Sequence, residues 1–442
     1  MNKATIRRKK ASARFPFTRA FLPLALEFVD KASASLGFDG PERTGLTLAA
    51  EELYVYHSSR TGGDVDIDLT LEDGGYRIVL TLSFHMVNPD MQALNLAFQV
   101  DLDDETALDM LGPMIAARSV SGLSLDFGAA EKILIRLWRE RPYDLSPALP
   151  LGNVKRQGIL RITDPGPEDL RYFCSLVASG NPEFSPEFLL KGAMAADMLT
   201  AGDLYAALAL DGETMVGGIV WRSLTESCVE MFGPYVFHED PGDEILTGLM
   251  DQAVSKISRT SVRGTLRRQG QMTGYARFFD YLGEIPMSDA KGNPMALSYY
   301  YRQLKEETGG KAIYSETQFA NFLRAEYDRL CLPRQIRETD FRTAGLRDHS
   351  VIAVEFKNRR TMAILRPLCA GRDMAENMAA HIALLGRQGI SSILFEIDSA
   401  RDEDMMFTKA LEAAGMVPGL IIPDAAKGDL IIFYLPAGSE PS

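Results

Sequence analysis

The chain has 442 residues, which is too many for one ordinary hydrophobic core, so we expect about two to four domains. Hydrophobic residues make up 46% and charged residues 24% of the sequence, which excludes a largely disordered protein. The formal net charge of −13 disfavours binding to nucleic acid, because an acidic surface repels the phosphate backbone.

The sequence predicts neither a membrane protein nor a metal site. The apolar run from Phe21 to Val29 is shorter than the roughly 20 residues that a membrane-spanning helix needs, and no cleavage site of a signal peptide follows it. The 4 cysteines lack CxxC spacing, and the 5 histidines form no HxxH or HExxH pair. We therefore expect a cytoplasmic protein with buried thiols, no membrane contact and no bound metal.

The first predicted module covers residues 1–148. It opens with the basic residues Arg7 to Lys10, for which we expect a solvated, flexible tail. Apolar residues at helical spacing and then in strict alternation predict two helices followed by a β-hairpin, at 20–38, 43–60 and 64–84. A proline-rich stretch over 142–154 predicts an exposed linker to the next module.

The second module is predicted over 155–310 and the third over 311–442. The second reads as strand, helix, three strands, helix, strand, helix and strand, and its last helix is predicted at 275–283. In both modules a strand, a short Gly/Asp loop, a helix, a strand, a helix and a strand follow at matching lengths. This repeat of about 130 residues predicts a duplicated domain. The alternative is two unrelated α/β units that share a generic periodicity.

The pattern of helix, Leu-Gly-Phe, helix and Ala-Ala-Glu-Glu-Leu within residues 15–145 resembles the anti-sigma-factor branch of the GHKL ATPases, the family with the histidine-kinase-type ATP fold. The resemblance implies an α/β sandwich in which a helix carries a glutamate and, four residues later, an asparagine that ligates Mg²⁺. Glu52 matches the glutamate and is therefore a candidate nucleotide-site residue. Tyr56 stands where the asparagine is expected, and a phenol is a poor Mg²⁺ ligand.

Two further motifs of that family are missing. Leu82 and Phe84 stand where the family has an adenine-binding Asp and its Gly, and residues 119–128 lack the clustered glycines of a phosphate lid. ATP and Mg²⁺ are therefore not expected as cofactors, and we expect no ATP turnover. The module would instead dock a protein partner, with Tyr54, Tyr56 and His57 facing it or, in the alternative, lying in the core.

The order of elements in 156–310 and 311–442 resembles the GNAT acyltransferase superfamily. The resemblance implies mixed-sheet domains in which two neighbouring strands separate and expose backbone groups to the pantetheine arm of acyl-CoA. It also implies that the next loop and the helix N-terminus bind the CoA pyrophosphate. The sequence therefore predicts the cofactor acetyl-CoA or another acyl-CoA.

The two modules differ in this loop. The middle module is predicted not to bind CoA there, because carboxylates repel phosphate and Pro241 lacks an N–H; the carboxylates belong to Glu239, Asp240, Asp243 and Glu244. In the third module the predicted cofactor-binding residues are Gly371, Arg372, Asp373 and Met374. The alternative for Asp373 is a plain helix cap, in a capping box with Glu376.

Catalytic groups are sparse. The superfamily often has a tyrosine as general acid four residues before the glycine that ends the last helix, and the matching residues here are Phe279 and Leu411. Glu230, on the strand expected to separate from its neighbour, is the candidate general base. The alternative is that Glu230 is a strand residue that simply faces solvent.

We thus predict an α/β protein of bacterial type, in which a GHKL-like α/β sandwich precedes two GNAT-like mixed-sheet domains. The predicted function is that of a regulatory protein. Its degenerate first module binds a protein partner, and its tandem acyltransferase-like part senses a small acyl-CoA ligand. The alternative is an active N-acyltransferase that uses acyl-CoA bound by the third module.

Overall fold

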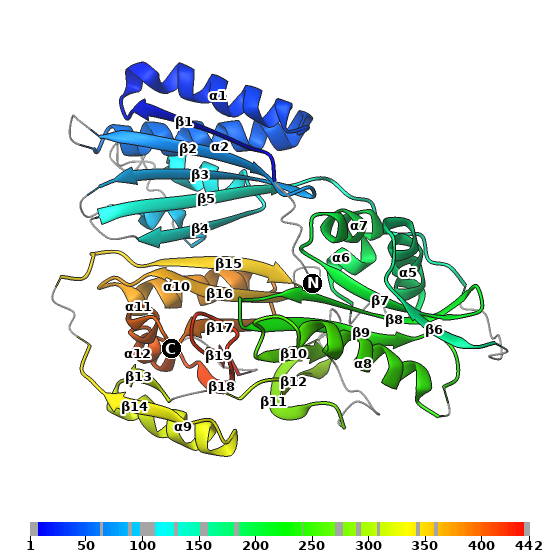
Figure 1. Ribbon diagram of the computed structural model, residues 1–442. Helices are drawn as coiled ribbons and strands as arrows, with labels where there is room; N and C mark the ends of the chain where they lie inside the picture. The colour runs from blue at the N-terminus through cyan, green and yellow to red at the C-terminus, as the bar shows by residue number, and fades with distance from the viewer. Residues whose placement is uncertain are drawn as a thin grey trace.

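The computed structural model describes residues 8–436, except 62–64, 87–90, 98–110, 128–130, 151–157, 181–184, 241, 270–276, 289–292, 307–309, 342–344 and 358–360. The chain forms a mixed α/β structure with three large sheets, each built from one continuous part of the sequence (Figure 1). The predicted fold class is therefore confirmed. None of the described helices is both long and apolar enough to cross a membrane.

The N-terminal unit is an antiparallel sheet whose strands lie in the order β1-β2-β3-β5-β4. The strands are β1 (Lys10–Pro16), β2 (Asp66–Asp73), β3 (Arg77–His85), β4 (Gly122–Phe127) and β5 (Lys132–Glu140). The other elements are η1 (Arg19–Phe21), α1 (Leu22–Ser35), α2 (Gly40–Ser58), η2 (Gln92–Leu94) and α4 (Leu111–Arg118). Every second residue of β2 and β3 is apolar, so one face of the sheet is buried against α1 and α2.

The middle unit is a seven-stranded sheet in the order β11-β12-β10-β9-β8-β7-β6. Its strands are β6 (Leu160–Thr163), β7 (Tyr205–Asp211), β8 (Thr214–Ser223), β9 (Cys228–Val236), β10 (Gly264–Gln269), β11 (Asp280–Ser288) and β12 (Pro294–Gln303). Its helices are α5 (Pro167–Gly180), α6 (Glu187–Leu190), α7 (Gly192–Thr200) and α8 (Glu244–Ile257). Only β9 and β10 pair in parallel, because α8 crosses over between them.

The third unit begins with a parallel pair, β13 (Lys311–Ser315) and β14 (Arg334–Glu338), around α9 (Thr317–Arg329). A five-stranded sheet follows in the order β15-β16-β17-β19-β18. Its elements are β15 (Val351–Lys357), β16 (Met362–Cys369), α10 (Met374–Arg387), β17 (Ser392–Asp398), α11 (Asp402–Met405), α12 (Thr408–Ala413), β18 (Val417–Ile422) and β19 (Leu430–Tyr434).

Five strands of the middle unit correspond one by one to the sheet of the third. The order β8-β9-β10-β12-β11 matches β15-β16-β17-β19-β18, and in each case only the second and third strands are parallel. In each case, too, one helix crosses over between the parallel strands, α8 in the middle unit and α10 in the third. Shared order, direction and crossover support the predicted duplication over the alternative of two unrelated units.

Both parallel pairs separate before their strands end. The register of β9 with β10 stops at Glu230 opposite Leu266, although β9 continues to Val236. The register of β16 with β17 stops at Leu365, although β16 continues to Cys369. Beyond these points the facing backbone groups are free to bind something other than the neighbouring strand.

The three units pack directly on one another. Asn95 of the N-terminal unit is buried against the third unit, where its Nδ2 donates to the Ser350 carbonyl at 2.8 Å and its Oδ1 accepts from the Ile352 N–H at 2.9 Å. Residues of β15 and β16 belong to the same apolar core as the N-terminal sheet. A second apolar core, which includes Leu266 and Leu394, joins the sheets of the middle and third units.

Two predictions about local structure are wrong. Lys10 begins β1, and the Arg8 guanidinium lies 2.5 Å from the Asp203 carboxylate, so these residues do not form a free tail; Arg7 lies outside the described residues. The helix predicted over 275–283 is instead strand from Asp280 onwards, and 275 and 276 are among the positions not described. β11 pairs with β12, and Leu282 is buried in the apolar core shared by the middle and third units; this tertiary gain outweighs the local helical pattern.

Candidate functional site

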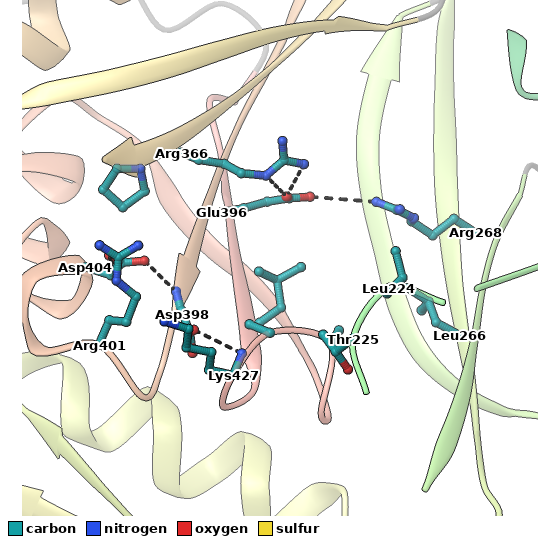
Figure 2. Close-up of a pocket in the computed structure, with 14 residues that line it drawn as sticks. Leu224, Thr225, Leu266, Arg268, Arg366, Glu396, Asp398, Arg401, Asp404 and Lys427 are labelled. Carbon is teal, nitrogen blue, oxygen red and sulfur yellow. Dashed lines mark hydrogen bonds and ion pairs between the residues drawn. The ribbon is translucent and has the colours of Figure 1, made fainter. Parts of the chain in front are cut away.

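Two cavities among the described residues border the third unit near the ends of β16 and β17. The first, here called the helix groove, has a volume of about 310 Å³ and lies between the start of α10 and α12; it is lined by Glu316, Phe341, Leu346, Arg372, Met374, Ala375, Met406, Lys409, Ala410 and Ala413. The second, here called the inter-unit pocket, also has a volume of about 310 Å³. It takes its lining from both the middle and the third unit (Figure 2).

The four residues predicted as the CoA site divide into two pairs. Arg372 and Met374 line the helix groove. Gly371 and Asp373 instead hold the preceding segment: a Cβ on Gly371 would lie 2.2 Å from the Ser350 nitrogen, and the Asp373 Oδ1 accepts from that same N–H at 2.5 Å. The Asp373 side chain makes no cap hydrogen bond to α10, so the capping-box alternative is wrong.

The helix groove combines an apolar wall with cations at its edge. Met374 and Met406 supply flexible apolar surface. The Arg372 guanidinium is exposed and lies 3.0 Å from the Asp348 carboxylate, while the Lys409 ammonium lies 2.8 Å from Glu316. This arrangement fits a ligand with an apolar arm and a phosphate end, because both cations can turn towards an anion without leaving water.

Side chains of the chain itself occupy the gap between β16 and β17. The Arg401 Nη2 donates to the Leu368 carbonyl at 3.3 Å, and the Glu403 carboxylate accepts from the Ala370 N–H at 3.4 Å. On the facing strand, the Asp398 N–H donates to the Asp404 carboxylate at 3.0 Å. These backbone groups lie at the separated ends of β16 and β17. The short helix α11 and the residue before it therefore close the gap.

The inter-unit pocket contains a chain of ion pairs that crosses from one unit to the other. Arg366 on β16 donates through Nε to the Glu396 Oε2 at 2.7 Å, and the second oxygen of Glu396 lies 3.7 Å from the Arg268 guanidinium of the middle unit (Figure 2). Deeper in the pocket, Asp398 accepts from the N–H groups of Lys427 and Gly428 at 3.0 and 2.9 Å. These bonds fix the loop between β18 and β19.

Glu230, the predicted general base, is bound between two arginines. Its Oε2 accepts from Arg222 at 2.9 Å and its Oε1 from Arg268 at 2.7 Å, and the residue is only 3% exposed. Burial opposes ionisation, but the two guanidinium groups outweigh it and lower the pKa of Glu230 to about 2. The alternative of a solvent-facing residue is therefore wrong. A carboxylate this acidic is also a very weak base at neutral pH.

The loop of the middle unit already carries an anion at the start of α8. The Asp240 carboxylate accepts from the N–H groups of Glu244, Ile245 and Leu246 at 2.9, 2.9 and 3.1 Å. These are the free donors of a helix N-terminus, the groups that would bind a pyrophosphate. Asp243 pairs with Arg277, and Pro241 lies outside the described residues. The predicted repulsion of phosphate is therefore not the only obstacle to CoA binding here. The Asp240 carboxylate already satisfies the N–H donors that a pyrophosphate would need.

In the N-terminal unit, three residues near the predicted nucleotide site lie in the hydrophobic core. Tyr54, Tyr56 and His57 are all buried, so the alternative of core residues is correct and none of them faces a partner. Burial lowers the pKa of His57 to about 3, so this ring is neutral. Glu52 lies against α4, where a Cβ on Gly112 would come within 2.8 Å of its Oε2. Among the described residues no group of acidic, His or Cys side chains could hold a metal ion.

We expect no Mg²⁺-dependent ATP hydrolysis by this protein. The ring of Tyr56 packs edge-on against His57, with 4.9 Å between centroids, and cannot be exchanged for a metal ligand without opening the core. A steady-state phosphate-release assay checks this, with Glu52→Ala as the variant. Turnover that requires Mg²⁺ and disappears in that variant would show that a nucleotide site exists.

Sequence reasoning missed the residues that close the strand gap and those that join the units. Arg401, Glu403 and Asp404 belong to a charged run directly after a buried strand, and that position was the available signal. Arg268 and Glu396 had no signal, because only the packing of the two sheets brings them together.

No protein-family model matches the sequence, and neither does any curated protein. Solved structures similar to parts of the chain are acetyltransferases. An acetyltransferase assigned to the GNAT family, from Desulfovibrio desulfuricans, is 17% identical, with a TM-score of 0.27 over 33% of this chain and 100% of its own. An N-acetyltransferase from Staphylococcus aureus Mu50 is 13% identical, with a TM-score of 0.30 over 34% of this chain and 100% of its own.

A third structure is the aminoglycoside 6′-N-acetyltransferase from Enterococcus faecium, 12% identical, with a TM-score of 0.28 over 34% of this chain and 99% of its own. An aminoglycoside 6′-N-acetyltransferase has also been solved with coenzyme A bound, again with 12% identity and a TM-score of 0.28, over 34% of this chain and 99% of that one. These four solved structures are acetyltransferases of low identity, each matched over about a third of this chain.

Proposed function

We propose that this chain is a regulatory protein that binds an acyl-CoA without transferring its acyl group. The observation that carries the proposal is the occupation of catalytic positions by the chain itself. Glu230 is bound between Arg222 and Arg268, and α11 closes the gap between β16 and β17. Acyl transfer needs a free base and an open path to the thioester; here the predicted base, Glu230, is not free, and the gap between β16 and β17 is closed.

The helix groove is the place that we assign to the CoA ligand. Arg372 and Lys409 would face the phosphates, and the methionine-lined wall would hold the pantetheine arm. The middle unit offers no equivalent, because Asp240 already satisfies the donors of its helix N-terminus. Bound in the groove, the ligand lies outside the closed strand gap, which suits a sensor better than an enzyme.

The N-terminal unit would act as a protein-docking module, as its resemblance to anti-sigma-factor GHKL domains suggests. The support is its packing within this chain, where Asn95 completes the hydrogen bonds at the start of β15. Through that contact a partner bound to the N-terminal unit would be linked to the third unit. ATP and Mg²⁺ have no part in this proposal.

The proposed CoA site makes an asymmetric prediction. Arg372→Glu replaces a cation of the helix groove with a carboxylate and is expected to weaken CoA binding by about tenfold. Glu239→Gln, in the exposed loop of the middle unit, is expected to leave the affinity unchanged. Titration calorimetry of CoA and acetyl-CoA into the wild type and both variants measures the difference.

A thermal-shift assay and an acyl-transfer assay complete the test. CoA at a hundredfold excess over its dissociation constant should stabilise the wild type by about 2.7 kcal/mol, while thiol release from acetyl-CoA should stay at background with a panel of amines. Equal losses in the two variants would show that the ligand binds elsewhere. Steady thiol release that Glu230→Gln abolishes would establish the alternative, an active N-acyltransferase.

A further inference from the structure

The inter-unit pocket contains charged groups that the proposed function does not use. Its walls come from two units: the turn between β8 and β9, together with β10, faces the ends of β16 and β17, α11 and the loop between β18 and β19. Both signs of charge line it: the cations belong to Arg268, Arg366, Arg401 and Lys427, and the carboxylates to Glu396, Asp398 and Asp404. Its volume of about 310 Å³ is at the lower end of the range for sites that bind metabolites.

Two buried carboxylate oxygens in this pocket accept no hydrogen bond from the described residues. They are the Oε1 of Glu396 and the Oδ1 of Asp404, and each residue is only 3% exposed. The Arg268 Nη1 lies 3.7 Å from the Glu396 Oε1 and the Arg401 Nε lies 3.3 Å from the Asp404 Oδ1, and neither contact is a hydrogen bond. Buried acceptors almost always have a donor, and these two oxygens belong to residues that line the same pocket, Glu396 on β17 and Asp404 on α11, so they favour a ligand that donates hydrogen bonds.

A positive charge at this pocket also has no ion-pair partner among the described residues. Lys427 lines it, and its ammonium forms no ion pair with the part of the chain that the structure describes. Its backbone is held by Asp398, so the residue cannot move far from the pocket. A purely cationic ligand would leave Lys427 facing another positive charge, and a purely anionic one would face Glu396 and Asp404.

We propose that the inter-unit pocket binds a small zwitterion of the amino-acid type. Its ammonium donates to the Glu396 Oε1 and, once the Asp404 carboxyl has given up its proton, to the Asp404 Oδ1, and its carboxylate lies towards Lys427 and Arg401. An ammonium carries three donors, which is enough for both unpartnered oxygens. Because Arg268 and the turn at Leu224 and Thr225 belong to the middle unit, the ligand contacts both units and stabilises their association.

The test uses the full chain and the twenty standard amino acids as probes. Thermal shift at millimolar concentration identifies those that stabilise the protein, and calorimetry gives their dissociation constants. For each amino acid that binds, the N-acetyl derivative lacks the ammonium and the amide lacks the carboxylate. We expect each derivative to bind at least tenfold more weakly, because each loses one charged pair.

Three variants locate the site. Glu396→Gln keeps the shape of the side chain but removes its negative charge. Lys427→Met removes the positive charge of the loop between β18 and β19. Each variant is expected to bind the amino acid about tenfold more weakly. Glu168→Gln, on the exposed face of α5, is the matched control and should bind as the wild type does. Lys427→Met keeps the test valid if Glu396→Gln does not fold.

Two results would overturn the proposal. One is that no amino acid stabilises the protein at concentrations up to about ten millimolar, which is weaker than a specific site of this kind allows. The other is that an amino acid binds but keeps its affinity in Lys427→Met, or after N-acetylation. Loss of affinity in both site variants and both derivatives, with the control unchanged, supports it.

Discussion

Glu230→Gln is expected to lower the free energy of unfolding of the protein by about 3 kcal/mol at pH 7. The carboxylate is buried and accepts hydrogen bonds from Arg222 and Arg268, which reach it from β8 and β10 on either side. The uncharged glutamine side chain cannot neutralise either arginine. The mostly buried Arg268 therefore loses the carboxylate closest to it. The size of the loss follows from the unpaired charge rather than from the lost hydrogen bonds alone.

The pH dependence of this effect has a definite sign. The folded-state pKa of Glu230, about 2, is below its ordinary value of 4.5, so its ion pairs contribute stability at pH values above 4.5. That contribution is lost as the pH falls from 4.5 towards 2, where the carboxylate takes up its proton. The difference between wild type and Glu230→Gln should therefore be largest at neutral pH and should shrink in acid.

Urea unfolding at pH 7 and at pH 3 measures both parts of the prediction. Glu168→Gln removes an exposed carboxylate that pairs with Arg171 on α5, and a surface pair of this kind contributes at most about 1 kcal/mol. A loss in Glu230→Gln no larger than in this control would mean that the buried ion pairs do not stabilise the fold. An equal loss at pH 7 and pH 3 would mean that the effect comes from the packing.

Most of the fold follows from local pattern. The strands from β7 to β9 and from β15 to β17 are short, apolar and bounded by turn residues, so sequence alone predicts them. The strand at 280–288 could not be predicted in this way, because its helix-like apolar spacing is overridden by pairing with β12. β1 was missed because its alternation is carried by small alanines within a basic segment.

Some residues of the candidate site could likewise be predicted from the sequence, and others could not. Arg372 and Met374 stand directly before a predicted helix, and this local position was sufficient to bring them to the helix groove. The role of Asp240 was predicted only as repulsion, because a carboxylate four residues before a helix can turn outward or fold back onto it. The inter-unit pocket depends on how two sheets pack, and no local pattern contains that information.

Carboxylates and an arginine of the chain itself bind the backbone groups at which the predicted acyltransferase resemblance implies a ligand. Asp240 binds the helix N-terminus in the middle unit, and Arg401, Glu403 and Asp404 bind the backbone of the separated strands in the third. Each of these contacts satisfies a backbone group that a ligand would otherwise satisfy, so the empty protein needs no ligand for stability at these points.

Asp404 carries a buried charge whose removal should stabilise the protein at high pH. Burial raises the pKa of its carboxyl to about 7, against the opposing effect of Arg401 and the Asp398 N–H, and the carboxylates of Asp398 and Glu403 add to the rise. Between its ordinary value of 3.8 and about 7, the folded protein therefore holds a proton that the unfolded chain has released. Stability falls as the pH rises through this window and is level above it.

Asp404→Asn is expected to be more stable than the wild type at pH 8, and its advantage should grow by about 2–3 kcal/mol between pH 5 and pH 8. The asparagine oxygen can still accept from the Asp398 N–H, so the contact with β17 is kept while the charge is lost. Urea unfolding at both pH values measures the change, and Asp402→Asn, an exposed position of the same helix, is the control. A stability difference between variant and wild type that does not change from pH 5 to pH 8 would show that the pKa of Asp404 is not raised in the folded protein.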